Sequence, residues 1–259
     1  MLKKLLVRAL LALLVLSNPA FSESSDPINI GATLTLSGGT AFWGNNARRG
    51  MDLAVAEVNK NGGVNGRPIK IIYEDFKEMD LRLAATAAQK LISLDKVKVV
   101  LTQWAEDTSV VTPVAAKAGI VVVSVSGGTK GLTLQSPLLY RVWPSDEAFV
   151  KESVGYLLKH GRKKLTVLSA QNVYLTNLSA LTAELWQQSQ GSKPFLQDVS
   201  PSEVDFRSVL LRIKQGRYDS VFFYIPIERM GLLLKQAGEI GLDIMKVGTQ
   251  HSDDKVVFD

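Results

Sequence analysis

Polar and aromatic residues follow several apolar runs of this sequence, and their types suit the binding of a small molecule. Gln103-Trp104-Ala105-Glu106-Asp107-Thr108 follows one such run, and Ser126-Gly127-Gly128-Thr129 follows the next. If the apolar runs are strands of a doubly wound sheet, the loops that follow them lie where such sheets bind ligands. These two segments are therefore the first candidates for a functional site.

Catalytic constellations are missing from the same sequence. It contains no G-x-x-x-x-G-K-S/T phosphate loop and no G-x-S-x-G elbow. With no Cys and only His160 and His251, thiolate chemistry and histidine-rich metal sites are excluded and hydrolase triads have few possible bases. We therefore expect no catalytic residues, no metal and no cofactor.

The glycines after the first expected strand allow one enzymatic interpretation, a dinucleotide-binding loop. Gly38, Gly39 and Gly44 follow the first apolar strand pattern, and Glu74 or Asp75 could be the ribose acid. However, the G-x-G-x-x-G spacing is absent and the acid lies beyond the usual separation of about 20 residues. A dinucleotide-dependent α/β enzyme therefore stays only as a less favoured alternative.

The composition describes a globular protein. Of 259 residues, 46% are hydrophobic and 21% charged, with 20 Gly, 9 Pro and no Cys, which excludes disordered, collagen-like and disulfide-scaffold classes. The formal net charge is +5. Nucleic acid is not an expected partner, because no cluster of Lys and Arg with interleaved aromatics is present.

The first 22 residues have the order of a secretory signal peptide. Three basic residues among the first eight precede the apolar run Ala9–Leu16, and the small residues Ala20 and Ser22 favour cleavage after Ser22. The run is shorter than the roughly 20 residues that span a bilayer. We therefore expect residues 1–22 to be removed on export to the periplasm, which leaves 27 basic against 25 acidic residues.

Short apolar strands alternate with amphipathic helices along the rest of the chain. The expected strands are 28–34, 69–73, 97–101, 120–125, 138–142, 165–168, 195–199, 221–224 and 246–249. Nearly uninterrupted apolar strands between amphipathic helices are typical of parallel sheets covered on both faces. The sequence therefore predicts an α/β fold with two doubly wound Rossmann-like lobes, 23–142 and 143–259, with function in the loops at the carboxyl ends of the strands.

Several motifs resemble the branched-chain amino-acid-binding family, the leucine-binding-protein-like receptors of ABC importers. The matching segments are Ile30–Gly38, Trp43-Gly44, Arg49–Ala54, Glu57–Gly66, Glu74-Asp75 and Gln236-Ala237-Gly238. The most specific of them is the turn Gly62-Gly63-Val64-Asn65-Gly66, which generic α/β propensity does not explain. The resemblance covers the whole chain after the signal peptide, in order.

The resemblance implies the type I periplasmic binding protein fold, in which two lobes close on a solute without doing chemistry. It implies a small-molecule ligand, either an amino acid or a small carboxylate that can be aromatic, and an ABC permease in the membrane as partner. Carried over position by position, it implies these ligand-binding residues: Trp43, Trp104, Ala105, Ser126, Gly128, Thr129, Tyr174, Tyr224 and Gln250.

Two positions depart from the family pattern. Gln250 stands where amino-acid binders carry an acid, so a ligand ammonium would lose a partner worth roughly 1.5–3 kcal/mol. Glu106 and Asp107 would repel a carboxylate unless they face solvent or, for Asp107, cap the helix. Trp43 and Trp104 suggest a flat or apolar ligand, so a small carboxylate is predicted rather than leucine. Alternatively, Trp104 packs inside lobe one and says nothing about the ligand.

The resemblance also bears on the length. Members of the family cross back to lobe one and return to lobe two, so a chain ending at Asp259 is expected to be an incomplete receptor that lacks the second crossing. A ligand-sensing domain of a signalling receptor with the same fold is the other alternative. It would need a transmembrane helix and an output domain beyond this sequence.

Overall fold

The computed structural model describes residues 26–77, 79–190, 192–252 and 257 and divides the chain into two compact units. The first unit comprises the residues up to Gln103 together with Val110–Val123, and the second comprises Trp104–Ser109 and the residues from Ser124 onward. The expected lobes, 23–142 and 143–259, divide the chain at another place and stay a prediction. The expected signal peptide, 1–22, lies outside the described residues.

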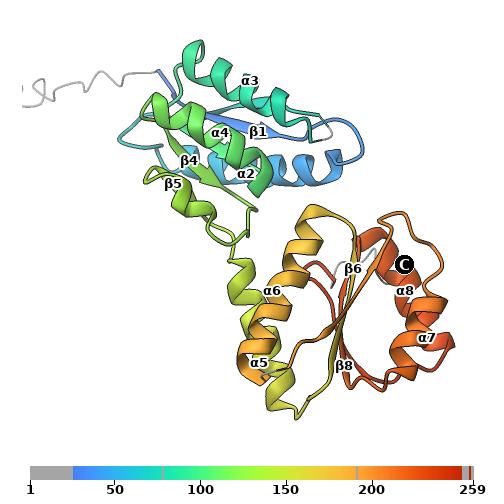
Figure 1. The fold of residues 1–259 in the computed structure, drawn as a ribbon. Helices are drawn as coiled ribbons and strands as arrows, with labels where there is room; N and C mark the ends of the chain where they lie inside the picture. Colours follow the sequence, from blue (N-terminus) through green and yellow to red (C-terminus); the bar gives the residue numbers. More distant parts are fainter. Residues whose placement is uncertain (1–25, 78, 191, 253–256, 258–259) are drawn as a thin grey trace, which may run out of the picture. The chain divides into compact units, whose positions relative to one another are not determined.

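The first sheet has five strands in the order β2-β1-β3-β4-β5. The strands are β1 (Ile28–Leu34), β2 (Ile69–Asp75), β3 (Val99–Thr102), β4 (Val121–Ser124) and β5 (Leu139–Arg141). β1 pairs in parallel with β2 and with β3. The helices along this stretch are α2 (Ala41–Lys60), α3 (Leu81–Ser93) and α4 (Ala105–Lys117), followed by a 3₁₀ helix at Leu132–Gln135. α2 and α3 both contact β1 and β2, and Figure 1 draws them on opposite faces of the sheet.

The turn that closes α2 shows why its sequence is specific. Gly62, Gly63, Asn65 and Gly66 all have positive φ, between 52° and 93°. A Cβ at Gly63 would lie 2.1 Å from the Arg67 carbonyl oxygen, so that position requires glycine. The glycine-rich turn is therefore a geometric requirement of the connection between α2 and β2.

The second sheet has four strands in the order β7-β6-β8-β9. They are β6 (Leu165–Ala170), β7 (Phe195–Val199), β8 (Ser220–Tyr224) and β9 (Met245–Val247), and each of their pairings is parallel. The helices are α5 (Asp146–Lys159), α6 (Val173–Gln190), α7 (Arg207–Gln215) and α8 (Ile227–Glu239). In Figure 1, α5 and α6 lie on one face of this sheet and α7 and α8 on the other.

The two central strands form the core of the second unit. Every residue of β6 and of β8 is buried, as expected for a parallel sheet with helices on both faces. A buried polar side chain links α8 to the loop before α7. The side-chain amide of Gln236, in α8, accepts a hydrogen bond from the Phe206 N–H at 2.7 Å and donates one to the Val204 carbonyl at 3.1 Å. The predicted α/β fold with parallel sheets is confirmed.

Two helix starts matter for function. α2 begins at Ala41, six residues before Ala47, where the apolar positions at helical spacing begin, so Trp43 lies on a helix. α6 begins at Val173, and Tyr174 lies in its first turn. No helix in the described ranges is long and apolar enough to cross a bilayer, and the apolar run Ala9–Leu16 falls outside those ranges.

Candidate functional site

The loop after β4 and the start of α5 form the centre of the site. The Asp146 N–H donates to the Gly128 carbonyl at 2.8 Å, and a Cβ at Gly128 would lie 2.1 Å from Asp146 Oδ1. Asp146 is the first residue of α5, where the Ser145 hydroxyl caps the helix by accepting from the Ala148 N–H at 3.0 Å. Only glycine at position 128 lets the carboxylate lie this close to the loop backbone.

Asp146 is the most perturbed acid of the described chain. Its side chain is 4% exposed, and burial raises its pKa from 3.8 to about 6. A hydrogen bond from Tyr174 and the positive charge of Arg141 favour the ionised form, whereas the charge of Glu106 opposes it. A carboxyl group that titrates close to neutral pH can meet a ligand either as an anion or as a neutral acid.

Two tyrosines lie with this acid. The Tyr174 hydroxyl is 3.5 Å from Asp146 Oδ1, and burial, together with the charge of Asp146, raises the pKa of Tyr174 above its ordinary value. Tyr224, at the end of β8, is fully buried, and its hydroxyl lies 2.6 Å from the Thr182 hydroxyl. Burial raises the pKa of Tyr224 as well. Both phenols therefore stay neutral and serve as hydrogen-bonding groups.

The loop after β3 touches this cluster through its backbone. A Cβ on Gly127 would lie 3.1 Å from the Ala105 nitrogen, which places the two loops in contact at the start of α4. Asp107 is not the helix cap that the sequence suggested. It lies in the first turn of α4, where its Oδ1 accepts from the Trp104 N–H at 2.6 Å. The reason is that the helix starts at Ala105, whereas an Asp107 cap would require a start at Thr108, three residues later.

The predicted residues are thus brought together only in part. Gly128, Tyr174 and Tyr224 gather around Asp146, and Trp104 and Ala105 border the same loop. Ser126 is half-buried, and the Thr129 carbonyl accepts from Arg141 at 3.4 Å. Trp43 belongs to the first unit, where its ring packs edge-on against Phe42 at 5.4 Å. Gln250 is half-buried in a turn after β9. The ligand-binding role of all nine residues stays a prediction.

Sequence reasoning missed Asp146, the acid at the centre of this arrangement. In sequence it follows Pro144-Ser145, and an acid just after a Ser cap is the ordinary composition of a first helical turn. The signal that could have found it is its position at a strand-to-helix connection of a doubly wound fold, next to the Ser126–Thr129 loop in the predicted sheet. Its burial and its contact with Gly128 could not be deduced from spacing.

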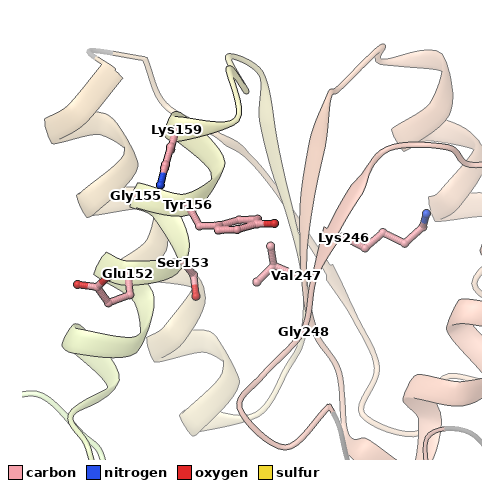
Figure 2. Close-up of a pocket in the computed structure, with 8 residues that line it drawn as sticks. All are labelled: Glu152, Ser153, Gly155, Tyr156, Lys159, Lys246, Val247 and Gly248. Carbon is pink, nitrogen blue, oxygen red and sulfur yellow. The ribbon is translucent and has the colours of Figure 1, made fainter.

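A separate hollow of about 710 Å³ lies between α5 and β9 (Figure 2). Its walls are Glu152, Ser153, Gly155, Tyr156 and Lys159 of α5 and Lys246, Val247 and Gly248 at β9. Figure 2 shows the Tyr156 ring and the Val247 side chain pointing toward one another, while Lys246 points away. None of the nine predicted site residues lines this hollow, so the cluster around Asp146 is the better candidate site.

The cluster defines the class of protein. It offers one buried acid, neutral phenol hydroxyls and loop backbone at the carboxyl ends of parallel strands, which is where α/β folds bind small ligands. Within the described ranges no group of three or more His, Cys, Asp and Glu residues could hold a metal ion. The hydrogen-bonding groups of this cluster suit the binding of a small polar molecule.

The family follows from comparison with known proteins. A family model described as periplasmic binding protein matches residues 27–257, and the chain belongs to this family. The leucine-, isoleucine-, valine-, threonine- and alanine-binding protein of Pseudomonas aeruginosa is 24% identical over 249 residues, covering 95% of this chain and 66% of that protein. Leu/Ile/Val-binding protein homolog 8 of Brucella suis is 29% identical over 254 residues, with coverages of 93% and 62%.

Solved structures agree on the fold. The branched-chain amino acid transporter substrate-binding protein of Streptococcus pneumoniae, in complex with isoleucine, is 25% identical with a TM-score of 0.74, and the match covers 86% of this chain and 64% of that one. A solute-binding protein of an ABC transporter from R. palustris, in complex with 4-hydroxybenzoate, is 20% identical with a TM-score of 0.75, covering 88% and 63%. The chain therefore spans a little under two thirds of the length of these relatives.

Proposed function

We propose that this protein is the solute receptor of an ABC importer and that its ligand is a small carboxylate carrying an amine, in the manner of an amino acid. The family is that of periplasmic solute-binding proteins, which are not enzymes, and it implies an extracytoplasmic location. Export by cleavage of residues 1–22, closure of two lobes on the ligand and delivery to a membrane permease are parts of the proposal.

The observation that carries the ligand class is the buried Asp146. An ammonium group brought next to its carboxylate would replace lost hydration with a charge-assisted hydrogen bond, which is worth roughly 1.5–3 kcal/mol. Asp146 therefore supplies the acid that Gln250 does not. The backbone at the start of α4 and the loop Ser126–Thr129 provide N–H and hydroxyl groups suited to the ligand carboxylate.

An aromatic carboxylate without an amine is the second candidate. Trp43 and Trp104 favour it, because indole faces cover flat apolar surface, and the R. palustris structure was determined with 4-hydroxybenzoate. With such a ligand Asp146 would have to be protonated, since an ionised carboxylate beside a ligand carboxylate is repulsive. Its pKa of about 6 makes that form accessible only at mildly acidic pH.

Calorimetric titration of matched variants separates the two ligand classes. The ligands are leucine, isoleucine, phenylalanine, benzoate and 4-hydroxybenzoate, and the proteins are the wild type, Asp146→Asn and Asp198→Asn. Asp198 is an exposed acid of β7 in the same unit and serves as the charge-matched control.

An amine-bearing ligand should bind the wild type and the control equally and bind Asp146→Asn at least tenfold more weakly, which corresponds to about 1.4 kcal/mol. Benzoate binding that Asp146→Asn leaves unchanged or strengthens would establish the aromatic alternative instead. If no member of either panel binds at pH 7.5 or at pH 5.5, the receptor proposal for this chain fails.

A further inference from the structure

A second hollow lies at the amino-terminal ends of the strands of the second sheet. It has a volume of about 430 Å³, and its lining includes Lys163, Lys164, Trp186, Lys193, Phe195 and Tyr218. These residues come from α6, from the connections before β6, β7 and β8, and from the first position of β7. The cluster around Asp146 lies at the other ends of the strands, so the two sites share no residue.

Three lysines from two separate connections contribute to this hollow. Among the described residues, the ammonium groups of Lys163 and Lys193 form no ion pair with a carboxylate. Lys164 donates to the Gly216 carbonyl at 2.7 Å and lies 5.1 Å from the centre of the Tyr218 ring. The charge of the hollow is therefore strongly positive.

The carboxylate of Asp219, which lies beside two of these lysines, already accepts hydrogen bonds from the loop backbone. The Asp219 carboxylate accepts from the Lys163 N–H at 2.7 Å and from the Lys164 N–H at 3.1 Å, and the Ser220 hydroxyl donates to it at 3.0 Å. These contacts hold the connection before β6 in place. The Asp219 carboxylate binds backbone N–H groups and a hydroxyl, and it forms no ion pair with an ammonium group of the described residues. Asp219 therefore organises the loop, while the excess positive charge faces solvent.

Aromatic side chains form the rest of the wall. The rings of Phe195 and Tyr218 are nearly parallel, 5° apart in orientation, with centroids 6.0 Å apart. Trp186 is 1% exposed and lines the hollow. Three aromatic side chains therefore line the same hollow as the lysines.

We propose that this hollow binds an oxyanion of the phosphate class. Three ammonium donors suit a group that carries more than one negative charge and several acceptor oxygens, and an aromatic wall lowers the local dielectric so that each contact is stronger than in open solvent. A monovalent carboxylate would use only part of this donor set. The phosphate is either free in solution or part of the headgroup of an anionic lipid.

Titration with inorganic phosphate tests whether the hollow binds a phosphate group, whichever of the two sources supplies it. The wild type, Lys163→Gln/Lys193→Gln and the charge-matched Lys151→Gln/Lys235→Gln are titrated calorimetrically with sodium phosphate at constant ionic strength. Lys151 and Lys235 are exposed on α5 and α8 and do not line the hollow. We expect Lys163→Gln/Lys193→Gln to weaken binding about tenfold, the worth of one charge-assisted hydrogen bond, and the control pair to leave it unchanged.

Vesicles distinguish the two sources of phosphate. Co-sedimentation with phosphatidylglycerol vesicles, but not with phosphatidylcholine vesicles, that is lost only in Lys163→Gln/Lys193→Gln assigns the hollow to a lipid headgroup. Phosphate binding without vesicle binding assigns it to the free anion. An equal loss in both double variants, or no binding of either probe, overturns the proposal. Amino-acid binding at the Asp146 cluster should be the same in all three proteins, so this test does not depend on the proposed function.

Discussion

Replacing Asp146 with asparagine should make the unliganded protein more stable at neutral pH. The substitution removes the buried charge and keeps the shape of the side chain. The pKa of Asp146 is raised from 3.8 to about 6, and each pKa unit is worth about 1.4 kcal/mol. Ionised Asp146 therefore costs the folded state about 3 kcal/mol, and the asparagine variant should gain up to that amount at pH 7.5.

The pH dependence follows from the direction of this shift. Between pH 4 and pH 6 the folded protein binds more protons at Asp146 than the unfolded chain does, so the wild type loses stability as pH rises through that window. The advantage of Asp146→Asn should be about 3 kcal/mol at pH 7.5, fall to roughly half at pH 5 and vanish below pH 4.

Urea denaturation of both proteins across this pH range measures the effect. Asp198→Asn, on an exposed part of β7, is the control and should stay within about 0.5 kcal/mol of the wild type. A variant that is less stable than the wild type at pH 7.5, or an advantage that does not change with pH, would refute the reasoning that Asp146 is buried at a cost to stability.

Three further substitutions test the packing at the site and elsewhere in the second unit. Gly128→Ala places a methyl group 2.1 Å from Asp146 Oδ1 and should lower the free energy of unfolding by about 1–3 kcal/mol. Gly155→Ala, whose methyl group meets no atom within 4 Å, should raise the free energy of unfolding by about 0.5–1 kcal/mol. Urea unfolding that ranks the two variants the other way would contradict this geometry. Gln236→Leu leaves the buried Phe206 N–H without its acceptor and should lower the melting temperature, at a cost of about 1–3 kcal/mol; an unchanged melting temperature would show that another acceptor replaces the amide.

The fold could be predicted from the sequence because its signals are local. Val121–Ser124 and Ser220–Tyr224 are short, almost wholly apolar runs, and each is bounded by a helix with a clear apolar face. Helix starts are harder to predict. The first turns of α2 (Ala41-Phe42-Trp43) and α6 (Val173-Tyr174-Leu175) carry apolar residues at consecutive positions, which do not show the helical spacing that periodicity uses. The start of α3 is clearer from the sequence, because Asp80 directly precedes its apolar face, and the Asp80 carboxylate accepts from the Arg82 N–H at 2.9 Å.

For the candidate site, the sequence could indicate the loops but not the acid at its centre. The Ser126–Thr129 segment and Tyr174 were named from the family resemblance, and Gly128 and Tyr174 both lie against Asp146. The acid itself was not named, because its role depends on burial and on a contact between residues 18 apart in the sequence. Desolvation, which sets its pKa, is a property of the packed protein and leaves no trace in residue spacing.

Proton release on ligand binding tests the central claim most directly. Leucine and isoleucine are titrated into the wild type and Asp146→Asn at pH 6 by calorimetry, in buffers with different ionisation enthalpies. Because Asp146 is about half protonated at this pH, an amine placed against it should release about half a proton from the wild type and none from the variant. Binding that takes up protons, or that releases the same number from both proteins, would contradict a site built around the ionised Asp146 carboxylate.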